Sequence, residues 1–162
     1  MLSREQIKFR DSFSSSLKQR LFYFKNLPMA LISGIKLIRL DEEKSVAEVP
    51  YRWRNKNPFK SMYFAVLSMA AELSTGAPAL LALKGTNADV VLIIVGLKAN
   101  FVKKATTKIT FTCEDFAVFS QALPQLREVN DTVEVTAKTI GKDANDDEVA
   151  NFEFTWSFKL RS

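Results

Sequence analysis

The side chains most able to do chemistry lie along one side of an apolar segment in the middle of the chain. Glu72 is the only charged residue between Lys60 and Lys84. A carboxylate in so apolar a stretch is costly unless it is paired, hydrogen-bonded or functional. Residues three and four positions apart share one face of a helix, and small and polar residues recur at this spacing around Glu72. These residues are Ser61, Ala65, Ser68, Thr75 and Gly76.

This spacing predicts a helix over residues 61–76 that carries a small, polar stripe. The rest of the helix is apolar and suited to packing under a sheet, so we expect the stripe to face a ligand or a partner subunit. Glu72 would then lie in a pocket. It could instead hydrogen-bond a neighbouring backbone group or form a salt bridge with another subunit, and residue chemistry alone leaves both interpretations open.

The composition excludes two common kinds of site. The chain has no histidine, so no histidine can act as a general base. Cys113 is the single cysteine, so it forms neither an internal disulfide nor a cysteine metal site. Its place in an alternating, strand-like run predicts a core residue. We expect no bound metal and no resident cofactor.

Length and composition predict one soluble domain over residues 1–162. Apolar residues make up 47% of the chain and charged residues 25%, the balance of a globular protein. The charged start lacks the apolar stretch of a secretory signal, and the longest apolar run, residues 90–95, is far too short to span a bilayer. We therefore expect a cytoplasmic protein with no membrane partner.

The net charge of +5 is unevenly distributed, with 13 basic and 6 acidic residues among the first 60. Such an excess favours nucleic acid, an anionic membrane or a phosphorylated cofactor as a partner. The basic residues are scattered, however, and are not interleaved with aromatic residues as in an RNA-binding strand. This pattern favours a solvated basic surface, and nucleic acid is not the expected partner.

Hydrophobic periodicity predicts the remaining elements. Residues 1–33 form a helical extension, because residues 4–26 are amphipathic and read as one broken helix or two short ones. Ser14, Ser15 or Ser16 can supply an N-cap between them. Three hairpins are expected, with residues 115–128 helical or irregular. The pairs are 35–40 with 45–54, 90–102 with 107–114, and 132–140 with 149–160.

Two of these strands alternate clearly between faces. One places Ala47, Val49, Tyr51 and Trp53 together, with Pro50 indicating an edge or a bulge. The last strand points Phe152, Phe154, Trp156, Phe158 and Leu160 one way. A run of strands around one buried helix predicts an α+β fold in which an antiparallel sheet wraps around a central helix.

The segment from Asn57 to Glu72 resembles the helix motif of the hotdog-fold acyl-CoA thioesterase-like superfamily, especially its branch called domain of unknown function 4442. In that family an Asn precedes a glycine turn, a His and an apolar helix. An acidic residue follows the Asn by fifteen positions, which is the spacing of Asn57 and Glu72. Residues 96–105 are similar to the family strand that contacts pantetheine or nucleotide. The strand order also agrees over residues 35–160.

The resemblance implies a hotdog fold and a site that hydrolyses a thioester. Glu72 would act as a base on water or attack the thioester carbonyl, with helix-start amides stabilising the oxyanion. Asn57 would orient the water or the carbonyl, and Tyr63, at the family's His position, would donate a hydrogen bond. Lys60 stands at the family's Gly position. The substrate would contact Ser61, Ser68, Thr75, Asn100, Lys103 and Lys104.

The resemblance also implies the partners. The substrate is an acyl-CoA or an acyl-carrier thioester, with coenzyme A present only as part of the substrate. Basic residues, namely Arg54, Lys56, Lys98, Lys103 and Lys104, could contact its phosphates or simply form a solvated edge. Family sites combine two subunits, so a homodimer or a dimer of dimers is expected. The missing His and Gly leave a non-catalytic acyl or acyl-CoA binder as the alternative.

Overall fold

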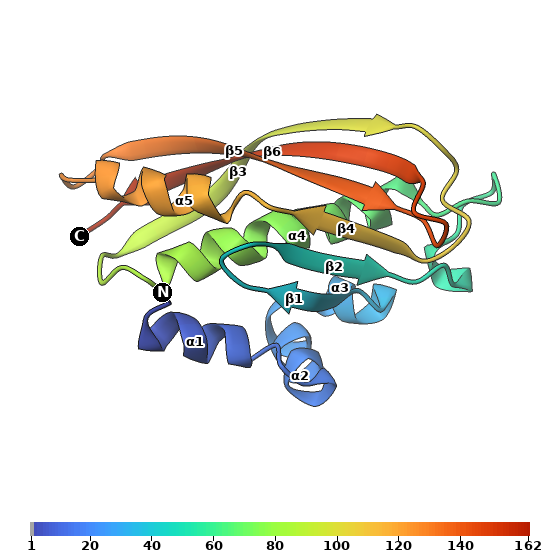
Figure 1. The fold of residues 1–162 in the computed structure, drawn as a ribbon, viewed down its shortest axis with the longest axis horizontal. Helices are drawn as coiled ribbons and strands as arrows, with labels where there is room; N and C mark the ends of the chain where they lie inside the picture. Colours follow the sequence, from blue (N-terminus) through green and yellow to red (C-terminus); the bar gives the residue numbers. More distant parts are fainter. Residues whose placement is uncertain (1) are drawn as a thin grey trace.

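A six-stranded antiparallel sheet packs around one long helix in the computed structural model, which describes residues 2–162 (Figure 1). Three helices precede the sheet, and a further short helix lies beside α4. The helices are α1 (Arg4–Asp11), α2 (Ser16–Asn26), α3 (Pro28–Ser33), α4 (Phe64–Leu83) and α5 (Phe116–Ala122). The strands are β1 (Lys36–Leu40), β2 (Ser45–Val49), β3 (Val90–Phe101), β4 (Ile109–Cys113), β5 (Thr132–Lys142) and β6 (Glu148–Leu160). This is the predicted α+β arrangement.

The central helix α4 differs from its prediction at both ends. It begins at Phe64, because residues 61–63 belong to the preceding turn, and it runs past Gly76 and Pro78 to Leu83. The prediction of residues 61–76 ended the helix at its breaker residues. Most of residues 70–82 are fully buried, and this packing outweighs the hydrogen bond that Pro78 removes.

Helix α4 is also, within residues 2–162, the one helix long and apolar enough to cross a bilayer, but 72% of its apolar window is buried inside the fold. That burial is typical of the core helix of a soluble protein.

The sheet order is β1-β2-β4-β5-β6-β3. The hairpins β1–β2 and β5–β6 confirm two of the predicted pairs. The predicted hairpin of residues 90–102 with 107–114 is wrong, because β3 pairs with β6 along its length while β4 lies between β2 and β5. An apolar run carries little register information, and the longer ladder with β6 decides the pairing. Strand β3 is consequently an edge of the sheet.

The core confirms the pattern of the last strand, since the five residues predicted to share a face, from Phe152 to Leu160, are all buried. Cys113 is buried as predicted, and burial raises the pKa of its thiol to about 12. Strand β2, however, ends at Val49, because Pro50 has no amide to donate. Trp53 therefore does not continue the buried face, and 88% of its surface is exposed.

The N-terminal extension is helical as predicted, and it forms two separate helices before a third, α3, which lies beyond the amphipathic pattern of residues 4–26. The side chain of Ser15 accepts a hydrogen bond from the Lys18 amide and so caps α2. Gln19 of α2 then bonds both backbone groups of Leu37, at 2.8 and 3.1 Å. These bonds cover the free edge of β1, which would otherwise expose unpaired backbone groups.

Candidate active site

Asn57 organises the turn that leads into α4. Its side-chain oxygen accepts hydrogen bonds from the amides of Phe59 and Ser61, at 3.0 and 3.2 Å. Its side-chain nitrogen donates to the Ser61 hydroxyl and the Met62 carbonyl, at 3.2 and 3.3 Å. Both ends of the amide are thus engaged within the turn. The structure places Asn57 and Ser61 together there, where they set the direction in which α4 begins.

Lys60 adopts a left-handed backbone conformation in this turn, with φ of 59°. This is the position at which the hotdog motif has glycine, and the chain keeps the glycine conformation with a residue that carries a Cβ. A non-glycine residue in this region costs roughly 1–2 kcal/mol. The departure from the motif therefore leaves the shape of the turn intact and lowers the stability of the fold.

Glu72 lies half-buried on α4, two turns into the helix. Its side chain forms no hydrogen bond or ion pair with any of residues 2–162. One carboxylate oxygen lies over Gly76, within 3.3 Å of where a Cβ would stand. Burial without a partner penalises the charged form, and it raises the pKa of Glu72 above the ordinary glutamate value.

Trp156 forms the wall behind Glu72. Its indole ring would lie 3.0 Å from a Cβ at position 76, so a side chain there would push the indole back by a few tenths of an ångström, and glycine allows the close approach of β6 to α4. The indole nitrogen donates to the Thr75 hydroxyl at 3.2 Å. Thr75 is fully buried, and its hydroxyl also bonds the Glu72 carbonyl. Thr75 therefore holds this wall from within the core. The predicted substrate contact would require Thr75 to line an open surface instead.

The polar stripe is only partly covered by the fold. Ala65, Ser68, Met69 and Glu72 are half-buried, although α4 is the central helix. Ser68 donates to the Phe64 carbonyl at 2.9 Å, which leaves its hydroxyl oxygen able to accept a further hydrogen bond. The uncovered part of α4 thus runs from its first turn to Glu72, as expected for a surface that meets a ligand or a partner subunit.

Tyr63 precedes the first residue of α4, and 47% of its surface is exposed. Its hydroxyl makes no hydrogen bond within the described part of the chain. Its ring packs edge-on against Phe64 at 5.1 Å, and Phe64 in turn contacts Phe101 of β3 at 6.3 Å. Tyr63 therefore begins a row of aromatic rings that leads from the start of α4 to the sheet edge.

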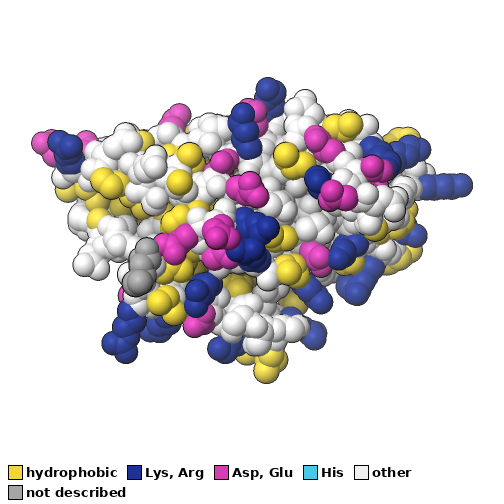
Figure 2. Space-filling model, viewed as in Figure 1, with side chains coloured by type: hydrophobic (Ala, Val, Ile, Leu, Met, Phe, Trp, Pro, Cys, Tyr) yellow, Lys and Arg dark blue, Asp and Glu magenta, His cyan; other side chains and the backbone are white. Residues whose placement is uncertain are grey.

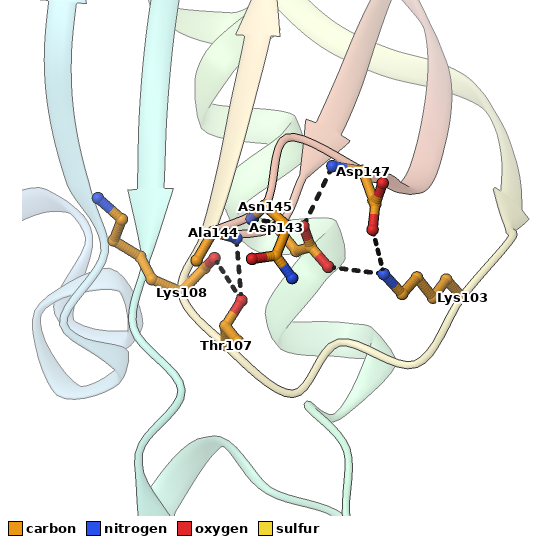
Figure 3. Close-up of polar contacts among 7 residues, drawn as sticks. All are labelled: Lys103, Thr107, Lys108, Asp143, Ala144, Asn145 and Asp147. Atoms are coloured by element: carbon orange, nitrogen blue, oxygen red, sulfur yellow. Dashed lines mark hydrogen bonds and ion pairs between the residues drawn. The ribbon is translucent and has the colours of Figure 1, made fainter.

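The three predicted substrate contacts that follow α4 are Asn100, Lys103 and Lys104, and they lie in different surroundings. Lys103 forms ion pairs with Asp147 and Asp143, at 2.6 and 3.0 Å (Figure 3). The hydrogen bond that Lys103 donates to Asp147 is the main cause that raises the pKa of Lys103, and the hydrogen bond that Lys103 donates to Asp143 lowers the pKa of Asp143. The two carboxylates thus give the surroundings of Lys103 a net negative charge. A phosphate contact by Lys103 is therefore not favoured by its surroundings.

Lys104 and Asn100 lie in other surroundings. Lys104 donates to the Phe59 carbonyl at 3.4 Å, which brings it to the turn that contains Asn57. Asn100 donates to the Asn151 side chain across the β3–β6 pair at 2.8 Å. Lys104 is consequently close to the start of α4, whereas Asn100 lies on the sheet edge.

Sequence reasoning missed two residues that shape the site, Gly76 and Trp156. A glycine inside an apolar helix signals a close approach, but the stripe assigned Gly76 to a ligand-facing position. Trp156 was expected only as core. Among residues 2–162, no group of three or more His, Cys, Asp or Glu side chains is placed to hold a metal ion.

Residues 12–158 match the profile of a family described as Domain of unknown function (DUF4442). A Pseudomonas aeruginosa protein described as a probable thioesterase has a similar structure, with a TM-score of 0.71 and 18% identity over 91% of this chain and 97% of its own. A protein of unknown function from Chlorobaculum tepidum gives a TM-score of 0.76 at 13% identity, covering 91% and 94% of the two chains.

A thioesterase from Haemophilus influenzae gives a TM-score of 0.63 at 14% identity, covering 86% of this chain and 88% of its own. A comparison with curated proteins gives no match.

Replacing Lys60 with glycine should stabilise the protein, because glycine adopts φ near 59° without steric cost. We expect the free energy of unfolding to rise by about 0.5–1 kcal/mol, measured by chemical denaturation. The matched control is Lys56→Gly, where φ is −85° and the backbone is extended, and this change should lower stability. A loss of stability in Lys60→Gly would contradict the strain at this turn.

Replacing Glu72 with glutamine should change how stability depends on pH. The pKa of Glu72 is raised in the folded state, so the folded protein binds this proton more tightly than the unfolded chain. The protonated form contributes stability below the unfolded pKa, and this contribution is lost as pH rises through the folded pKa. Glu72→Gln should therefore be near wild type in acid and become increasingly more stable than wild type towards neutral pH.

Urea denaturation of both proteins across that pH range measures the difference. The control is Ser68→Ala, one turn earlier on the same stripe, which carries no charge and should shift stability equally at every pH. A constant difference between wild type and Glu72→Gln would show that the Glu72 carboxylate gains a partner in solution.

Proposed function

Because the chain belongs to the hotdog-fold family described as Domain of unknown function (DUF4442), we propose that it is a thioesterase and that Glu72 drives the reaction. One observation carries the proposal. Glu72 is a half-buried carboxylate without a partner, and its raised pKa moves it towards the range in which a general base works near neutral pH. The proposed substrate is an acyl-CoA or an acyl-carrier thioester.

In the proposed reaction, the Glu72 carboxylate takes a proton from a water molecule. The water oxygen attacks the thioester carbonyl carbon, and the carbonyl oxygen becomes an oxyanion. The tetrahedral intermediate then breaks its carbon–sulfur bond and releases a thiolate and a carboxylic acid. A thiol has a pKa of about 8.5, so the thiolate leaves without a strong general acid and takes its proton from Glu72 or from solvent.

The first turn of α4 offers donors for the oxyanion. The amides of Phe64 and Ala65 have no acceptor among residues 2–162, and no side chain caps the helix start. Unpaired amides at a helix N-terminus attract negative charge. They would stabilise the oxyanion if a thioester carbonyl lay against them.

One chain cannot supply both groups to one substrate. Ala65 and Glu72 are seven residues apart on a single helix, which separates them by roughly 10 Å along its axis. A reacting carbonyl needs both at about 3 Å. A second copy whose α4 runs antiparallel beside the first would bring its helix start to Glu72, and this geometry supports the homodimer expected from the family.

Strand β3 supports the same dimer. Ile94 and Leu97 pair with Trp156 and Phe154 and therefore share the helix-facing side of the sheet, yet 40% and 55% of their surfaces are exposed. Phe101, on the same strand, is 50% exposed. The helix-facing side of β3 thus extends beyond the cover of α4. Pairing of two β3 edges would complete this layer and place two α4 helices side by side.

A non-catalytic acyl binder is the second candidate. The engagement of both ends of the Asn57 amide within its own turn favours it, because Asn57 then cannot orient water without breaking that turn. Tyr63, in place of the family's His, also lacks the proton-transfer ability of imidazole near neutral pH.

Hydrolysis of a panel of acyl-CoAs by wild type and Glu72→Gln tests the proposed reaction. Loss of the base should lower kcat/KM by about 10²–10⁴-fold, and wild-type activity should rise with pH as Glu72 ionises. The control is Glu134→Gln, at an exposed position of β5, which should keep wild-type activity. Acyl-CoA binding without turnover would establish the binder instead, and absence of both binding and turnover would exclude both candidates.

The oligomeric proposal has its own test. Leu97→Lys places a charge on the exposed, helix-facing side of β3 and should convert a dimer into a monomer by light scattering after gel filtration. Turnover should fall with it, because the two groups no longer meet. Leu21→Lys, at a similarly exposed position of α2, is the control and should stay dimeric. A monomeric wild type that hydrolyses thioesters would reject the shared site.

A further inference from the structure

A cavity of about 520 Å³ lies between the N-terminal extension and the β1 edge of the sheet. Helices α2 and α3 form one side of it, and the start of β1 and the end of β2 form the other. Lys36 and Glu48 are paired neighbours on these strands. Ala47 and Val49, on either side of Glu48, are fully buried, so Glu48 points to the other face. The sheet therefore separates this cavity from Glu72.

Cationic side chains dominate the lining. Arg20, Lys36, Arg52, Arg54 and Lys108 all line the cavity, against the single carboxylate of Glu48. Glu48 is already paired with Lys108 at 2.6 Å. The remaining four cations form no ion pair and no side-chain hydrogen bond with the described part of the chain. All four side chains are exposed, so water screens their mutual repulsion, and an anion bound between them would add favourable contacts with several cations at once.

Part of the cavity wall is apolar. Tyr23 lines the cavity with only 1% of its surface exposed, and its hydroxyl is buried near the Leu37 backbone. Leu31, Ile35 and Pro50 add apolar surface beside it.

We propose that this cavity binds a small ligand that carries phosphate groups. Arginine forms paired hydrogen bonds with phosphate oxygens, and three unpaired arginines converge here with Lys36. The volume lies in the range of about 300–1,000 Å³ that holds small molecules and cofactors. The apolar wall suits a ligand with an organic part next to its phosphates.

This site also gives a physical reason for the uneven charge of the sequence. Four of its cations fall within the first 60 residues, where 13 basic and 6 acidic residues occur. On the visible face, Lys and Arg side chains occur at several places, among them the region where Figure 1 places α3 (Figure 2). The basic excess is therefore divided between this concave site and open surface.

Isothermal titration of the protein with pyrophosphate and with ADP tests the proposal. Wild type should bind at least one of them with a Kd below ~1 mM, and Lys36→Gln/Arg52→Gln should weaken that binding by about tenfold or more. The matched control is Lys25→Gln/Lys159→Gln, which removes the same charge from exposed positions outside the cavity and should change binding by no more than about twofold. Circular dichroism of each variant establishes that it is folded.

A phosphate group can also come from a lipid, and sedimentation with phosphatidylglycerol vesicles separates the two sources. Binding of ADP or pyrophosphate that depends on Lys36 and Arg52 identifies a soluble ligand. Vesicle binding with the same dependence, without binding of either soluble probe, identifies a lipid headgroup. Absence of binding to all three probes, or an equal loss in the control pair, overturns the proposal.

Discussion

The contact between Trp156 and α4 determines where the rest of the site lies. The indole ring lies close against the helix because Gly76 has no side chain, and its nitrogen donates a hydrogen bond to the buried Thr75 hydroxyl. This contact fixes the rotation of α4 about its axis. Glu72 stands one turn before Gly76, so the same contact directs the carboxylate to the border of the core, where it is desolvated but not paired. A side chain at position 76 would disturb both the packing and the carboxylate.

Several groups in the single chain lack a partner. Strand β3 extends its apolar, helix-facing side beyond the cover of α4, and its edge is unpaired. The first amides of α4 lack acceptors, and Glu72 lacks a donor. Each group carries a cost for an isolated chain, because exposed apolar surface and unpaired polar groups both raise the free energy of the fold. In the proposed dimer, one interface would cover the apolar side of β3 and bring partners to the α4 amides and to Glu72. We therefore prefer the dimer to separate explanations.

The two faces of the sheet have different chemistry. The face towards α4 is apolar and packs against the helix that carries Glu72. The opposite face at β1 and β2 carries cations around a cavity that the N-terminal extension closes. Gln19 binds the extension to the β1 edge, so α2 both protects that edge and supplies Arg20 to the cavity. The N-terminal helical extension, which lies outside the sheet and α4, is therefore part of the second proposed site.

Local periodicity in the sequence was enough to predict the buried helix, the stripe with Glu72, the alternation of the last strand and two hairpins, because each depends on neighbours within a few residues. The ends of α4, the partner of β3 and the exposure of Trp53 were decided by packing. At the site, packing also decided the roles of Thr75 and Lys103. Thr75 accepts a hydrogen bond from Trp156, and Lys103 forms ion pairs with two carboxylates some 40 residues away. The residue types offered these side chains as ligand contacts, but only the tertiary structure brings together the distant groups that leave Glu72 unpaired and engage the others.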